Sequence, residues 1–121
     1  MIRLELLSKD NSIFFSDDFN AYLHPKMCRA IIEWFTSDKN TNCQFIFNSH
    51  DIINMNKELF RRDEIWFAYR DEDYSSRLVA LSNIVNYKGE QIRNDATYYK
   101  QYLEGKYGAD PFIKKGFSWN E

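Results

Sequence analysis

Two adjacent carboxylates, Asp17 and Asp18, come directly after the apolar run Ile-Phe-Phe at residues 13–15 and a serine. Such a run predicts a buried strand, and open α/β sheets bind ligands beyond the carboxyl ends of their strands. Neighbouring carboxylates repel each other and are costly to bury unless a cation or hydrogen-bond donors compensate them. The pair is therefore a candidate magnesium and phosphate site. A solvated turn after a strand has the same composition, so that interpretation stays open for the pair taken alone.

A helix is predicted to follow these carboxylates. Pro25 suits a first helical position, and the apolar residues after it recur at the spacing of a buried stripe that ends near residue 35. The expected stripe consists of Met27, Ala30, Ile31 and Trp34. Residues 43–47 then form a second apolar run, which predicts a second strand. A strand, a helix and a strand in this order imply a parallel crossover connection.

The second predicted strand also ends in polar residues, the sequence Asn-Ser-His-Asp at 48–51. Because the carboxyl ends of parallel strands meet at one edge of a sheet, we expect His50 to lie beside Asp17 and Asp18. A single histidine after a strand is more often a loop residue or a helix cap. Its expected position next to two carboxylates favours a role in function.

The rest of the chain predicts smaller elements. Residues 52–60 predict a short helix and turn, and residues 64–69 and 77–81 predict the strands of a hairpin at the sheet edge. Three tyrosines predict a last helix before a glycine. They are Tyr98, Tyr99 and Tyr102. Such a cluster can stack nucleic-acid bases, but packing of the helix onto the sheet is the favoured interpretation.

The segment at residues 17–25 resembles the Walker B and D-loop region of ABC-type AAA ATPases. More narrowly, it is similar to prokaryotic ATP-binding proteins related to abortive-infection and restriction-associated systems, whose pattern is Asp-Glu-x-Asp-x-x-Leu-His-Pro. The matching residues are Asp17, Leu23, His24 and Pro25. Two polar positions depart from the pattern, since Asp18 stands where Glu is usual and Asn20 where Asp is usual.

Three further segments resemble the same family in the same order. Residues 44–51 are similar to its H-switch, whose histidine reaches the γ-phosphate, although Asn-Ser precedes His50 where Thr-Thr is usual. Residues 61–67 resemble its arginine, aspartate and aromatic strand, and residues 102–112 its terminal Tyr-Leu-x-Gly-x-Tyr-Gly-x-x-Pro signature. Together these segments extend over nearly the whole chain.

The resemblance implies an α/β fold, a partial P-loop NTPase sandwich of parallel strands with a crossover helix, an edge hairpin and a C-terminal helix. We expect one domain over residues 1–121. The glycine-rich loop that holds nucleotide phosphates, Gly-x-x-x-x-Gly-Lys-Ser/Thr, does not occur in the sequence, and neither does the family's signature motif. The chain therefore resembles the C-terminal part of an ATPase head. ATP and Mg²⁺ are expected as cofactors only together with the missing P-loop half.

In a complete head, the resemblance assigns a role to each candidate residue. Asp17 would hold magnesium, Asp18 would polarise the attacking water, Asn20 would contact the nucleotide, and His50 would touch the γ-phosphate. Asp18 is one methylene shorter than the usual Glu, and misplacing such a group by about 1 Å costs on the order of a hundredfold in rate. We therefore expect slow hydrolysis even in the complete enzyme, and none by this chain alone.

Two other functions fit the same residues. The first is an interaction or dimerisation module that has kept the fold and lost catalysis. The second is an unrelated phosphoacceptor or metal-dependent phosphatase, because paired aspartates after a strand suit those proteins too. Phosphoacceptor receivers also need hydroxyl and lysine groups at successive strand ends, which residues 48–50 supply poorly.

Composition and charge limit the partners. With 44% hydrophobic residues, the 121-residue chain can form one core, and its formal net charge of −2 indicates no general attraction to nucleic acid or anionic membranes. No run approaches membrane-spanning length and no secretory signal pattern begins the chain, so we expect a cytoplasmic protein with no membrane partner. The expected partners are an upstream P-loop segment, a second ATPase subunit or another copy of the chain. Phage defence follows only from the family resemblance.

The cysteines and histidines show no spacing typical of a zinc site. They are Cys28, Cys43, His24 and His50. We expect neither zinc nor a disulfide, with His24 at the start of a helix and the thiols packed.

Overall fold

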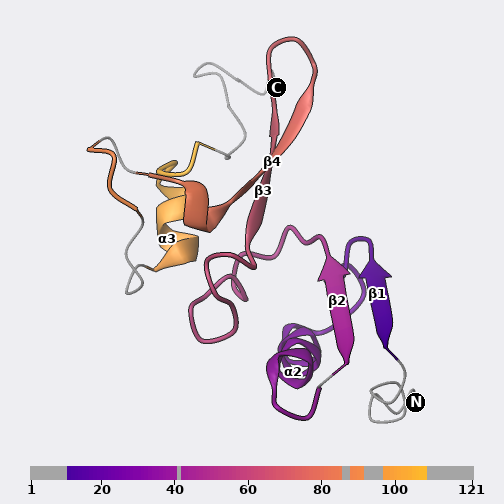
Figure 1. The fold of residues 1–121 in the computed structure, drawn as a ribbon. Coiled ribbons are helices and arrows are strands. Elements are labelled where there is room, and N and C mark those ends of the chain that lie inside the picture. The colour runs from indigo at the N-terminus through magenta and orange to yellow at the C-terminus, as the bar shows by residue number, and fades with distance from the viewer. Residues whose placement is uncertain (1–10, 41, 86–87, 92–96, 109–121) are drawn as a thin grey trace, which may run out of the picture. The chain divides into compact units, whose positions relative to one another are not determined.

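The computed structural model describes residues 11–40, 42–85, 88–91 and 97–108. The protein is a small mixed α/β protein with one parallel and one antiparallel two-stranded sheet (Figure 1). The elements in these ranges are β1 (Ser12–Ser16), α2 (Pro25–Thr36), β2 (Cys43–Phe47), β3 (Trp66–Arg70), β4 (Ser76–Ala80), the short 3₁₀ helix η1 (Leu81–Asn83) and α3 (Tyr98–Leu103). None of the helices in these ranges is long and apolar enough to cross a membrane.

The chain divides into two compact units, unit 1 (residues 1–60) and unit 2 (residues 61–121). The predicted single domain over residues 1–121 stays a prediction, and each unit is described by itself. The end of the predicted terminal signature, residues 109–112, lies outside the described residues.

Unit 1 contains the predicted strand, helix and strand. β1 and β2 pair in parallel, from Ser12 opposite Cys43 to Ser16 opposite Phe47, and α2 connects them. The predicted parallel crossover arrangement is therefore confirmed. Alternate side chains of the two strands face α2, as their burial pattern shows.

Aromatic contacts join α2 to this sheet. The ring of Phe35 in α2 stacks on Phe45 of β2, with 4.7 Å between centroids, and meets Phe14 of β1 edge-on at 5.8 Å. Such pairs contribute packing energy beyond the apolar area that they bury. One face of the sheet is thus covered by α2.

The start of α2 is capped by the residues that the sequence indicated. His24 is the N-cap, and its Nδ1 accepts a hydrogen bond from the backbone N–H of Lys26 at 3.2 Å. Pro25 follows as the first helical residue, where a missing N–H costs nothing. The prediction of a helix-start histidine is confirmed.

The buried stripe of α2 differs from the predicted one. Cys28 and Ile32 are buried, whereas Met27 and Ala30 are exposed. Cys28 and Ile32 pack in one cluster with Phe19 and Leu59, two residues outside the helix. Contacts with those distant segments select the buried face, and helical periodicity alone does not reveal them.

Residues 52–60 form turns, so the short helix predicted there is wrong. Asp51 Oδ1 accepts the N–H of Ile53 at 2.8 Å, and Asn56 Oδ1 accepts that of Glu58 at 3.1 Å. Asp and Asn side chains that bond the backbone two residues on offer it an alternative to helical hydrogen bonds.

Unit 2 contains the predicted hairpin. β3 and β4 pair antiparallel, from Trp66 opposite Ala80 to Arg70 opposite Ser76. Among the described residues these strands form a sheet of their own and do not extend the β1–β2 sheet, so the predicted position at the edge of that sheet is wrong. The segment that joins β2 to β3 consists of turns and carries the chain from one compact unit to the next.

The tyrosines of unit 2 pack the last helix onto the hairpin. Tyr102 of α3 stacks on Phe67 of β3, with ring centroids 5.6 Å apart and planes inclined by 7°. Tyr98 is buried, while Tyr99 is exposed. The packing interpretation is thus confirmed for Tyr98 and Tyr102 and wrong for Tyr99.

Candidate functional site

The polar ends of β1 and β2 lie side by side. The parallel ladder continues past the strands, because the N–H of Asn48 donates to the carbonyl of Ser16 at 3.3 Å. The N–H of Phe19 in turn donates to the carbonyl of Asn48 at 3.1 Å. The loop after β1 and the loop after β2 therefore meet at one edge of the sheet (Figure 1). This confirms the predicted convergence of the two strand ends.

Asn48 joins the two carboxylate residues. Its amide nitrogen donates to Asp17 Oδ1 at 2.7 Å, and its amide oxygen accepts the backbone N–H of Asp18 at 2.6 Å. In the sequence, Asn48 stands only where the ATPase family that this segment resembles usually has Thr. A side-chain amide can donate one hydrogen bond and accept another, so an Asn at this strand end was the feature of the sequence that indicated a bridging role.

Asp18 has an unusual backbone conformation. Its φ is +50°, in the left-handed region that aspartate tolerates better than most residues. The N–H bond to Asn48 and a bond from the N–H of Ala21 to the Asp18 carbonyl, at 2.8 Å, hold this conformation. Backbone hydrogen bonds therefore fix the position of Asp18, and its carboxylate oxygens are not needed for this purpose.

His50 lies beside Asp18, as predicted. Its Nε2 is 4.0 Å from Asp18 Oδ1, and the two side chains are 94% and 58% exposed. An exposed pair of this kind contributes little to stability even when the imidazole is charged. Both groups are therefore accessible to a ligand.

Asn20 and Ser49 link the two loops at a second point. Ser49 Oγ donates to Asn20 Oδ1 at 2.7 Å and accepts the N–H of Asp51 at 2.9 Å. The structure thus gives Asn20 a part in holding the loops. Its predicted contact with a nucleotide stays a prediction.

Asp51 belongs to the supporting framework of the site. Its two carboxylate oxygens accept the backbone N–H of Ile53 at 2.8 Å and the side-chain amide of the buried Asn54 at 3.0 Å. Local hydrogen bonds of this kind fix a loop. Sequence reasoning assigned Asp51 no structural role, although an Asx turn was a readable signal.

Phe19 anchors the loop that carries the carboxylates. It is 8% exposed, and its ring lies 5.1 Å from Phe45 and 4.8 Å from Phe47. A buried aromatic side chain next to Asp18 ties the position of the site to the core of unit 1.

The donor set suits a cation that is shared with another ligand. Among the described residues no group of three His, Cys, Asp or Glu side chains could hold a metal ion. Asp17 and Asp18 are both exposed, and each carboxylate has two oxygens that can bind a cation. Mg²⁺ prefers oxygen ligands and commonly binds one or two carboxylates together with waters and substrate phosphates, so this pair fits half of such a site.

The thiols lie apart from this chemistry. Neither Cys28 nor Cys43 is part of a disulfide, and Cys28 is buried with its Sγ 3.9 Å from the carbonyl of Leu23. Burial and, to a smaller extent, the charge of Asp51 raise the pKa of the Cys28 thiol. A buried thiol with a raised pKa is a poor nucleophile.

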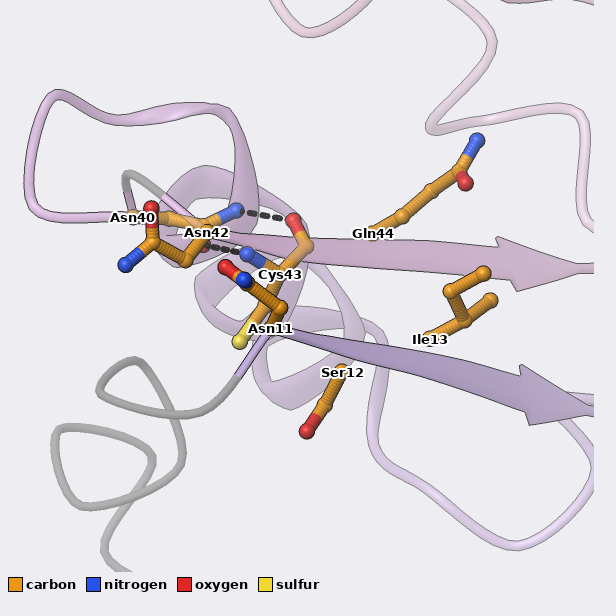
Figure 2. A pocket seen from close by; sticks show the side chains of 7 residues that line it. All are labelled: Asn11, Ser12, Ile13, Asn40, Asn42, Cys43 and Gln44. Carbon is orange, nitrogen blue, oxygen red and sulfur yellow. Dashed lines mark hydrogen bonds between the residues drawn. The ribbon is translucent and has the colours of Figure 1, made fainter.

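A hollow of about 520 Å³ lies at the opposite, amino end of β1 and β2. Figure 2 shows its lining, which is mostly amide side chains. Asn40 is engaged there, because its amide donates to the carbonyl of Cys43 at 2.7 Å and accepts the Cys43 N–H at 2.9 Å. Cys43 is the titratable group of the lining, so the hollow offers little acid or base chemistry.

The edge formed by the two strand ends therefore holds the chemistry of unit 1: two carboxylates, an imidazole and two amides, held by backbone and Asn48 contacts and open to solvent. Oxygen and imidazole groups in this arrangement can bind a hydrated divalent cation, accept a proton and donate to a phosphate. No protein-family model, no curated protein and no solved structure matches this chain.

Proposed function

We propose that this edge is part of the nucleotide site of an ATPase and supplies its magnesium-binding, water-polarising and γ-phosphate-sensing residues. The observation that supports the proposal is the convergence of Asp17, Asp18 and His50 at the carboxyl ends of two parallel strands. Open α/β sheets bind their ligands at this edge. The fold in this proposal is a partial P-loop NTPase sandwich.

Asp17 is the proposed magnesium ligand. Asn48 occupies one lone pair of its Oδ1, and a carboxylate has about four such sites, so oxygen positions remain for an ion or its waters. The bond to Asn48 restricts the rotation of the carboxylate and so lowers the entropy lost on binding. A magnesium ion supplies charge neutralisation on nucleotide phosphates.

Asp18 and His50 are the proposed catalytic pair. Asp18 accepts a hydrogen bond from the attacking water, and His50 donates to phosphate oxygens as charge develops on them. Their separation of 4.0 Å leaves the two groups close enough to act on neighbouring atoms of one phosphoryl group. Asn20 contributes to the nucleotide contact through the same loop.

The rest of the site comes from elsewhere in this proposal. The sequence contains no P-loop, whose amides and lysine hold nucleotide phosphates in such enzymes. A P-loop-bearing segment or a second ATPase subunit completes the site, and the chain alone hydrolyses no ATP. The process that the enzyme serves, phage defence, belongs to the same proposal.

The metal half of the proposal can be tested on the chain itself. Mn²⁺, a paramagnetic substitute for Mg²⁺, is titrated into the ¹⁵N-labelled protein, and line broadening is expected to centre on residues 17–20. The acidic turn at residues 71–73 of unit 2 is the internal control, because it has three carboxylates. Asp17→Asn should remove the broadening at the edge and leave that of the turn unchanged. Equal broadening at both places in the original protein would contradict a specific site.

The catalytic half needs the completed enzyme. With the P-loop segment or subunit supplied, Asp17→Asn should abolish turnover, and His50→Ala should lower kcat by about 10²-fold. Asp18→Glu restores the usual reach of the water-polarising group and should raise kcat by up to about a hundredfold. Unchanged or slower turnover in Asp18→Glu would count against the role of Asp18.

One observation supports the alternative of a catalytically inactive interaction module. Ile13, Phe15 and Ile46 are exposed on the face of the β1–β2 sheet opposite α2. Exposed apolar side chains that lie together mark interaction surfaces. A partner that binds this face with no effect of Asp17→Asn or His50→Ala on any activity of the complex would favour the module.

A further inference from the structure

One face of the β1–β2 sheet has no cover among the residues of unit 1 that the structure describes. On this uncovered face Ile13, Phe15 and Ile46 are 58%, 75% and 43% exposed, while α2 lies against the other face. Parallel sheets are covered on both faces in nearly all proteins. The exposed side chains therefore indicate a missing layer.

The uncovered face is acidic at one end. Side chains alternate along a strand, so Asp17 and Asn48, which follow Phe15 and Ile46 by two residues, lie on the same face. Their side chains touch across the strands at 2.7 Å. The face thus presents three apolar side chains, the neutral amide of Gln44 beside Ile13, and a carboxylate at its carboxyl end.

The dimensions of this face match one helix. Two strands about 4.8 Å apart are spanned by a helix about 10 Å wide. Residues two apart on a strand are separated by roughly 6.7 Å, close to the roughly 6 Å between helical residues one turn apart. Apolar residues on successive turns can therefore meet Ile13 and Phe15, and the next turn then reaches Asp17.

We propose that the uncovered face binds an amphipathic helix whose apolar stripe ends in a lysine or arginine that pairs with Asp17. The helix residue that meets Asp17 is expected to be positively charged, because Asp17 is a carboxylate and the other side chains of the face are neutral. The helix belongs to the P-loop-bearing segment or subunit. This assignment of the helix rests on the proposed function.

A second copy of the chain fits this face less well. The same face of a second copy carries no lysine or arginine to meet Asp17. It brings a second Asp17 carboxylate instead, and like charges that meet across an interface oppose binding.

Two designed peptides provide the test. Both are alanine-rich, about 18 residues long and carry the same leucine stripe, with lysine at both ends of the stripe in one peptide and glutamate in the other. They are titrated into the ¹⁵N-labelled full chain, and amide shifts are followed by NMR. The lysine peptide should shift residues 13–17 and 44–48 and bind about fivefold or more tightly than the glutamate peptide.

Variants separate the apolar and the charged contributions. Phe15→Ser should weaken the lysine peptide by at least about tenfold while the protein stays folded, because this side chain is mostly exposed. Ile53→Ser is the matched control, since Ile53 is a similarly exposed apolar residue of unit 1, at 69% against 75% for Phe15, and should leave binding unchanged. Asp17→Asn should reduce the preference for lysine to about twofold or less.

Three results would overturn the inference. These are no shifts on the uncovered face, equal binding of the two peptides, or concentration-dependent self-association that Phe15→Ser removes, which would make a second copy the occupant. The test uses neither nucleotide nor metal. Its failure would leave the proposed ATPase site standing, and failure of the Mn²⁺ experiment would leave the helix-binding face standing.

Discussion

The two units place their polar groups in opposite ways. In unit 1 carboxylates, amides and an imidazole gather at an exposed strand edge and bond to one another. In unit 2 the phenols of Tyr98 and Tyr107 are inside, with 3% and 4% of these residues exposed, and the Tyr107 hydroxyl donates to Gln101 at 2.9 Å. A ligand site needs groups that are held in place and still accessible. Unit 1 has such groups, whereas the tyrosines of unit 2 serve packing.

The carboxylates in the hairpin turn of unit 2 differ from Asp18 of unit 1 in the same sense. In the hairpin turn of unit 2, Asp73 accepts bonds from the N–H and the hydroxyl of Ser75, at 3.0 and 2.6 Å, and these bonds lower the pKa of Asp73. Asp71 pairs with Arg77 at 3.3 Å. The oxygens of these two carboxylates are therefore engaged in hydrogen bonds or an ion pair with residues that are close in the sequence. Asp18 is instead held through its backbone, which leaves its oxygens available.

Phe19→Ala is expected to have the largest effect, because it removes the anchor that ties the acidic loop to the core of unit 1. Loss of a buried aromatic ring should lower the free energy of unfolding by about 3 kcal/mol. Native-state hydrogen exchange should show the loss at the amides of β1 and β2. We expect the amides of β3 and β4 to change by less than about 1 kcal/mol, since unit 2 is a separate compact unit.

Ile53→Ala is the control for that experiment, and it should change stability by no more than about 0.5 kcal/mol because Ile53 is exposed. An equal loss of protection in both units of Phe19→Ala would show that they unfold as one body. The division of the chain into two energetic units would then be wrong.

The protonation of Tyr107 tests the buried phenols of unit 2. Burial, followed by the nearby Tyr98, raises the pKa of Tyr107 from 10.0 to about 12. The folded state therefore favours the protonated phenol, and this stabilisation is complete below pH 10 and is lost as the pH rises through about 12. The free energy of unfolding should fall by about 2 kcal/mol over that interval.

Denaturant unfolding at several pH values, together with tyrosinate absorbance, measures this effect. Tyr107→Phe should flatten the decrease, while Tyr99→Phe, at an exposed position of α3, should leave it unchanged. An undiminished decrease in Tyr107→Phe would assign the effect to other groups.

The sequence predicted β1, α2 and β2 of unit 1 because their signals are local, whereas the helix predicted at residues 52–60 is wrong. The apolar runs and Pro25 identify two strands and a helix, and parallel pairing then brings the strand ends together. The bridging role of Asn48 depends on residues about 30 positions away, and the buried face of α2 depends on contacts of Cys28 with Phe19 and Leu59. No local pattern encodes these contacts. For the same reason the sequence predicted a hairpin and could not predict that it forms a separate sheet.

Asn48→Ala tests whether the edge of unit 1 is held together by its amide. Two exposed hydrogen bonds are lost, and the free energy of unfolding should fall by about 1 kcal/mol. Asn48→Asp should cost more near neutral pH, because a second carboxylate then faces Asp17, and the excess should disappear as carboxylates protonate toward about pH 4. Urea unfolding at both pH values measures this, with the exposed Asn42→Ala as control. No difference between Asn48→Ala and Asn42→Ala would remove Asn48 from the framework of the site.

The smallest expected effects concern residues other than glycine that have a positive φ. Among the described residues there is one in each unit, Asp18 at +50° and Tyr74 at +66°. Glycine relieves the steric cost of this conformation but gives the unfolded chain more freedom. Tyr74→Gly also loses the contact of its ring with the Arg70 guanidinium, 5.0 Å away, which is worth about 0.5–1 kcal/mol at an exposed site. Tyr74→Gly should therefore lower stability slightly.

Asp18→Gly should leave stability unchanged or raise it by up to about 0.5 kcal/mol, because the exposed contact between the Asp18 carboxylate and His50, at 4.0 Å, contributes little to stability. Urea unfolding measures both variants, and Asp18→Ala, which keeps the steric cost, should lose about 1 kcal/mol. Stability that is indifferent to the Asp18 carboxylate would mean that this group is present at the edge for a purpose other than folding, as a catalytic role requires. A loss of more than about 1 kcal/mol in Asp18→Gly would instead make Asp18 a structural carboxylate, like Asp71 and Asp73 in the turn of unit 2.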